Sequence, residues 1–139
     1  MNKFIFVFII LILNIVEAKA DEDYFNKALN LFNKNNYLEA KYYFEKSIAF
    51  NPKDEKSYLY LAKISKINKD QVGEDNFLNT VLFLNPKNEE ALYSRILLNI
   101  NEADFKKAQD QILVFSKICK KLCSKQNDLS KLIIVDNKK

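Results

Sequence analysis

Apolar residues recur at three- and four-residue intervals along most of this 139-residue chain. Tyr24, Ala28 and Leu31 fall on one face of a helix, and a similar stripe runs through residues 37–48. Residues three or four apart share a helical face, so this spacing predicts two amphipathic helices. The polar stretch at 33–36 contains poor helix formers and predicts a turn between them.

The pattern returns with a fixed period. Pro52 and Pro86 lie 34 residues apart, each within an Asn-Pro-Lys triplet, and each predicts a helix end because proline disfavours helical dihedral angles in the residue before it. A period of this length is typical of a stacked repeat array. Residues 123–139 are expected to form a capping helix and a frayed tail. The period defines three helix-turn-helix blocks: 21–54, 55–88 and 89–122.

Residues 21–122 resemble tetratricopeptide repeats. Glu74 and Ile96 depart from the family, because they stand where it has small residues, and Lys120 stands where it has proline. The resemblance implies an all-α, right-handed solenoid of three repeats with a C-terminal capping helix. A non-repetitive helical bundle is the alternative. In the first block, the family's large, small and turn positions are filled by Tyr24, Ala28, Leu31, Tyr37, Ala40, Phe44 and Pro52.

Residues 1–20 have the pattern of a signal peptide. Lys3 precedes an apolar run at 4–13, and Ala18 and Ala20 offer the small residues that a signal peptidase recognises. The run is shorter than the about 20 residues that a membrane-spanning helix needs. We therefore expect cleavage after Ala20 and a periplasmic or secreted mature chain without a stable membrane span. A retained anchor is the alternative.

The composition argues against an enzyme and against nucleic-acid binding. The formal net charge is +4, and the lysines are scattered as on solvated helix surfaces. The chain has no His, which removes Ser-His and Cys-His nucleophile pairs and imidazole metal ligands. Gly73 is the only glycine, so no glycine-rich phosphate loop can form. Glu89 and Glu90 suit the positive end of a helix dipole. We expect no catalytic residue, metal or cofactor.

Cys119 and Cys123 are the only cysteines, and in an exported chain they favour a disulfide. Residues four apart in a regular helix have Cβ atoms about 6 Å apart. A disulfide needs about 3.8 Å. The second helix of the third block is therefore expected to end near Cys119, with the disulfide joining it to the capping helix. Two free thiols, or a redox or metal site, are the alternatives.

In the tetratricopeptide family, the first helix of each block lines a concave groove. Together with the signal-peptide pattern, the resemblance therefore implies a non-enzymatic exported adaptor that binds a peptide or protein segment, in envelope assembly or in maturation of exported proteins. Its ligand would carry apolar residues and a negative charge. A thiol-redox helper that uses the two cysteines, for example in cytochrome maturation, and a self-associating scaffold are alternatives. The groove positions assigned by the resemblance are Phe25, Leu29, Phe32, Tyr60, Lys63, Lys66, Tyr93 and Ser94.

Overall fold

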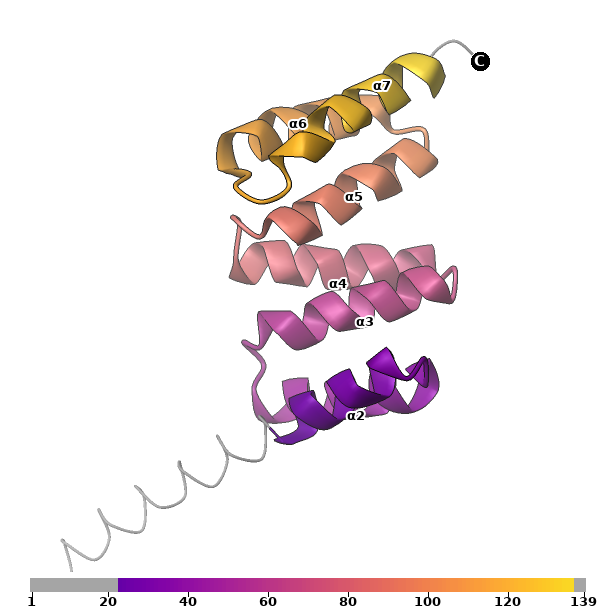
Figure 1. The fold of residues 1–139 in the computed structure, drawn as a ribbon, viewed down its shortest axis with the longest axis vertical. Helices are drawn as coiled ribbons and strands as arrows, with labels where there is room; N and C mark the ends of the chain where they lie inside the picture. The colour runs from indigo at the N-terminus through magenta and orange to yellow at the C-terminus, as the bar shows by residue number, and fades with distance from the viewer. Residues whose placement is uncertain (1–22, 137–139) are drawn as a thin grey trace, which may run out of the picture. The chain divides into compact units, whose positions relative to one another are not determined.

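The computed structural model describes residues 23–136, and all regular secondary structure within them is helical, as the sequence predicts (Figure 1). None of these helices is long and apolar enough to cross a membrane. The predicted signal peptide at residues 1–20, with its cleavage site after Ala20, lies outside the described residues. A first helix covers residues 23–33. The others are α2 (Tyr37–Phe50), α3 (Glu55–Ile67), α4 (Gln71–Leu84), α5 (Glu89–Asn101), α6 (Phe105–Ile118), the 3-10 helix η1 (Cys123–Lys125) and α7 (Gln126–Asp136).

The two helices within each block are joined by the same tight turn. At the end of α5, the Ala103 N–H donates to the Ile100 carbonyl at 3.0 Å, and the Asp104 N–H donates to the Asn99 carbonyl at 2.9 Å. This pair of bonds is the Schellman motif, whose central residue has a left-handed backbone. The same bonds recur in the other two turns. The left-handed residues, with their φ angles, are Asn35 (60°), Lys69 (58°) and Ala103 (58°).

The residue after each left-handed position caps the next helix. Its side-chain oxygen accepts the backbone N–H three residues ahead, which satisfies one of the unpaired donors of a helix start. Because the last residue of one motif is the cap of the next helix, the turn needs no additional residues. The caps are Asn36 for α2, Asp70 for α4 and Asp104 for α6.

The Asn-Pro-Lys triplets also have equivalent geometry. The Asn51 Oδ1 atom accepts the Lys53 N–H at 3.1 Å, and the Asn85 Oδ1 atom accepts the Lys87 N–H at 3.1 Å. The 34-residue period of the sequence is therefore a period of turn hydrogen bonds as well as of apolar positions.

The chain forms two compact units that divide between Ile64 and Ser65, within α3. In the first unit, the small residues Ala28 and Ala40 are fully buried together with Phe44. An alanine presents little bulk, so burial at these two positions is consistent with a close approach of the helix at 23–33 to α2.

In the second unit, each helix packs against the next one along the chain, in the order α4, α5, α6 and α7 (Figure 1). α7 packs on α6 and contributes Leu129 and Ile133 to the apolar core. Ile96 is fully buried in this core although the family has a small residue there. The other core residues are Leu92, Ile100, Ala108, Ile112 and Phe115.

Glu74 also occupies a position where the family has a small residue, and its side chain is buried. Burial raises its pKa, an effect that the nearby Lys66 ammonium opposes. The Lys66 Nζ atom lies 3.9 Å from the Glu74 carboxylate. The adjacent Gly73 makes room for other side chains, because a Cβ atom there would collide with the Asp70 carboxylate and would lie 2.8 Å from the Ser65 hydroxyl.

Candidate functional site

A connected cluster of aromatic rings in the first unit includes Phe25, Phe32, Phe44 and Tyr60. Phe44 is fully buried, and its ring stacks on that of Tyr60 with the centroids 5.0 Å apart. Phe25 and Phe32 pack edge-on to Tyr60, at 6.0 and 5.0 Å. Unlike Phe44, these three rings are only partly buried. The buried ring therefore supports a layer of aromatic surface that remains in contact with solvent.

Two lysines lie at the edge of this aromatic surface. The Lys63 Nζ atom is 4.5 Å from the centroid of the Tyr60 ring, and the Lys56 Nζ atom is 6.0 Å from that of Phe25. Cations are attracted to the faces of aromatic rings, and these contacts hold positive charge beside apolar surface. Leu29, on the same helix as Phe25, is half-buried. The combination suits a ligand with apolar groups and a negative charge.

Four of the predicted groove residues thus meet at one ring. Phe25, Phe32 and Lys63 each contact the ring of Tyr60. Of the predicted residues in the second unit, Lys66 forms the ion pair with Glu74.

Tyr93 and Ser94, also predicted for the groove, line one cavity of about 670 Å³ in the second unit. Tyr93 and Leu122 are its large apolar residues, and both are half-buried. The other residues around it are Asn88, Glu89, Glu90 and Lys121.

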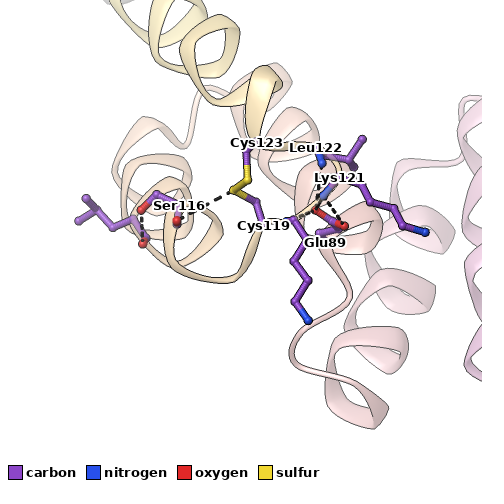
Figure 2. Close-up of a disulfide and its surroundings, with 8 residues drawn as sticks. Glu89, Ser116, Cys119, Lys121, Leu122 and Cys123 are labelled. Atoms are coloured by element: carbon purple, nitrogen blue, oxygen red, sulfur yellow. Dashed lines mark hydrogen bonds between the residues drawn. A yellow bond between two sulfur atoms is a disulfide. The ribbon is translucent and has the colours of Figure 1, made fainter.

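Glu89 has a role that the sequence did not reveal. Its carboxylate accepts the backbone N–H groups of three successive residues, Lys120 at 2.8 Å, Lys121 at 3.0 Å and Leu122 at 3.0 Å (Figure 2). The hydrogen bonds from Lys120 and Leu122 are the main cause that lowers the pKa of the Glu89 carboxyl. The prediction that Glu89 serves the dipole of its own helix was therefore incomplete. Its donors lie 31 to 33 residues away in the sequence, and no pattern near Glu89 indicates them.

The disulfide lies beside these bonds. α6 ends at Ile118, with Cys119 as its C-cap, which confirms the predicted helix end. Cys119 is bonded to Cys123, and their Cα atoms are 5.2 Å apart (Figure 2). Cys123 begins η1, which leads directly into α7. The disulfide therefore brackets the segment whose N–H groups Glu89 accepts. Among residues 23–136, no group of three or more metal-ligating side chains converges.

A second aromatic cluster in the first unit also escaped prediction. The Lys46 ammonium lies 4.7 Å from the ring centroid of Tyr42 and 5.3 Å from that of Tyr24. The Lys27 ammonium donates to the Tyr43 hydroxyl at 2.7 Å. These tyrosine hydroxyls raise the pKa of both lysines through hydrogen bonds, that of Lys46 through Tyr42 and that of Lys27 through Tyr43. Lysines of this chain therefore lie over aromatic rings in both clusters of the first unit.

No family model and no curated protein matches this sequence. Solved structures do match the fold. The type III secretion translocator chaperone SycD of Yersinia enterocolitica matches with a TM-score of 0.76 and 11% identity, over 85% of this chain and 86% of that one. SycD in complex with a peptide of the translocator YopD gives 0.72 and 10%, over 82% and 89%. The TPR domain of Arabidopsis OM64 gives 0.72 and 14%, over 83% and 98%. The chain therefore has the tetratricopeptide repeat (TPR) fold.

Proposed function

We propose that this chain is a non-enzymatic adaptor that holds a peptide or protein segment against the aromatic surface of Phe25, Phe32 and Tyr60. The observation that carries this proposal is that the three rings are joined into one surface yet remain partly exposed. Aromatic side chains contribute large contact areas to interfaces at a low cost in conformational entropy.

The ligand follows from the chemistry of this surface. An apolar or aromatic side chain would pack against Phe32 and Tyr60, and an acidic group nearby would face Lys63 and Lys56. The TPR fold supports this class of ligand, since SycD, which shares the fold, has been solved with a peptide bound. The cavity beside Tyr93, in the second unit, would by itself accept a side chain of a bound peptide.

The place of action is a further part of the proposal. The positive charge of Lys3 and the apolar run at 4–13 that follows it support export to the periplasm or the medium. An adaptor there would act in envelope assembly or in the maturation of exported proteins. Sequencing the N-terminus of the mature protein tests this, and a chain that begins at Asp21 is the expected result.

Site-specific photo-crosslinking tests the binding surface. A photoreactive phenylalanine at Leu29 should give a defined crosslinked partner, and Lys63→Glu should abolish that product. The matched control places the probe at Leu38 on α2, which is 86% exposed and lies outside the aromatic cluster. Equal products from both positions would contradict the proposal. So would a product that survives both Lys63→Glu and the Phe25→Ala/Lys63→Glu double substitution in a chain that is still helical.

The exposure of Cys123 favours a second candidate function, thiol-redox assistance. Cys123 is exposed and Cys119 is half-buried, so the Cys123 sulfur is the one that a partner thiolate would attack. A Cys119→Ser variant retains Cys123 and would trap mixed disulfides with redox partners. The adaptor proposal expects no specific trapped partner, whereas the redox candidate requires one.

A further inference from the structure

One wall of the cavity beside Tyr93 is a short piece of non-helical backbone. Lys121 and Leu122 line the cavity from the segment that connects α6 to η1. Residues 119–122 lie between α6 and η1 and belong to neither helix. The position of this wall therefore depends on contacts with other groups.

Two devices fix the wall. The first is the Glu89 carboxylate, which projects from the start of α5 and accepts the three N–H groups of Lys120, Lys121 and Leu122. The second is the Cys119–Cys123 disulfide, which closes the ends of the same segment (Figure 2). Three successive N–H groups can point at one carboxylate only in a narrow range of backbone conformations, and the disulfide restricts the segment toward that range.

Contacts other than the disulfide also hold α7 in the unit. α7 is held by Leu129, which is fully buried, and by Ile133, which is 4% exposed. These residues pack in the same core as Phe115 of α6. In the chain-entropy account, a disulfide that closes so short a loop contributes less to global stability than one that closes a long loop. Loss of the disulfide would thus be felt first in the wall.

We infer that the Cys119–Cys123 disulfide is a redox switch for this cavity: the oxidised protein holds the wall against Glu89, and reduction by a dithiol releases it. Release moves Leu122 away from Tyr93 and leaves the Glu89 carboxylate without its three donors, so the cavity becomes wider and more negative. The use of the cavity by a bound peptide rests on the proposed function, but the switch itself does not.

The chemistry of the switch balances with a dithiol as the only co-reactant. One thiolate attacks the exposed Cys123 sulfur, the Sγ–Sγ bond breaks, and the electron pair leaves on Cys119, which then takes up a proton. The second thiolate of the dithiol attacks the mixed disulfide and releases Cys123 as a second thiol. Two electrons and two protons have then passed to the protein, and the dithiol has become a cyclic disulfide.

Amide hydrogen exchange measured by NMR tests the inference without any ligand. In the oxidised protein, the Lys120, Lys121 and Leu122 amides should exchange slowly. Addition of dithiothreitol should accelerate their exchange by about tenfold or more, because their acceptor is lost. The Phe115 and Leu129 amides, within α6 and α7, should change little. The Tyr93 ring resonances should shift on reduction, since the wall faces that ring across the cavity.

Two variants separate the switch from the effect of the reductant. The Cys119→Ser/Cys123→Ser double variant should show the fast exchange without dithiothreitol and no further change with it. Glu89→Gln should accelerate the same three amides in the oxidised protein, because the charged acceptor is lost. Asp110→Asn, the same chemical change at an exposed position on α6, is the matched control and should leave these amides slow.

Slow exchange at the three amides after complete reduction would overturn the inference. Simultaneous loss of protection throughout α5, α6 and α7 would also overturn it, because the disulfide would then hold the whole unit. Failure of the crosslinking test at Leu29 would leave this result unaffected, so the two proposals can fail independently.

Discussion

Replacement of Ala103 by glycine should stabilise the protein. Ala103 has a φ of 58° at the centre of the Schellman motif that ends α5, a position where glycine is the usual residue. In the left-handed region, the Cβ atom of an L-residue approaches the following carbonyl oxygen, at a cost of about 1–2 kcal/mol. Glycine has no Cβ and avoids that cost.

The gain is reduced by the greater freedom of glycine in the unfolded chain, about 0.4–1 kcal/mol. With the middle of each range, the net effect of Ala103→Gly is a stabilisation of about 0.5–1 kcal/mol. For a domain of this size, that corresponds to an increase in Tm of about 2–5 °C. The side chain of Ala103 is exposed, so its removal leaves no cavity.

Thermal unfolding followed by far-UV circular dichroism measures this shift, and two other substitutions calibrate it. Asn35→Gly changes the equivalent turn, but asparagine tolerates the left-handed region, and the Asn35 side chain accepts the Tyr37 hydroxyl at 2.6 Å. It should give no gain. Ala49→Gly changes an exposed alanine within α2 and should lose about 1 kcal/mol. A Tm for Ala103→Gly that falls as for Ala49→Gly would refute the reasoning.

Three further substitutions have defined outcomes in the same melting assay. Glu89 has a lowered pKa, so its contribution to folding stability is present above the ordinary glutamate pKa and is lost as the pH falls through the lowered value. Glu89→Gln should therefore reduce the fall of Tm at acid pH. Glu74 has a raised pKa, so its contribution to folding stability is present below the ordinary glutamate pKa and is lost as the pH rises through the raised value. Glu74→Gln should therefore remove this fall of Tm with rising pH. Gly73→Ala should not raise Tm despite the better helix propensity of alanine, because its Cβ would displace the Asp70 cap.

The helices and their order could be predicted because the apolar period is a local property of the sequence. Pro52 and Pro86 ended the predicted helices correctly, since α2 and α4 stop at Phe50 and Leu84. The left-handed turn residues were harder to foresee. Glycine usually marks a left-handed position, and Lys69 and Ala103 stand there instead. Their conformation follows from the two helices that the turn must join.

The candidate site was predicted less completely than the fold. The register carried over from the tetratricopeptide family named Phe25, Phe32 and Tyr60, and the structure brings their rings together. Their use as a binding groove stays a prediction. The register could not give the pairing of Lys66 with Glu74, because a buried carboxylate recruits a cation from whichever residue is near in space. Nor could it give the contacts of Glu89, which join segments more than 30 residues apart in the chain.

The third block shows how a repeat can end without its proline. In the first two blocks, proline at the third position of Phe-Asn-Pro or Leu-Asn-Pro has no N–H group to donate. Lys120 stands in the equivalent place and does have one, and Glu89 accepts it. Cys119 before it already has an extended backbone, with φ −59° and ψ 143°, so the helix stops there although no proline follows. Lys120 thus supplies the first of the three donors that bind Glu89, and the disulfide adds a covalent constraint at the position where the other two blocks have the rigid proline ring.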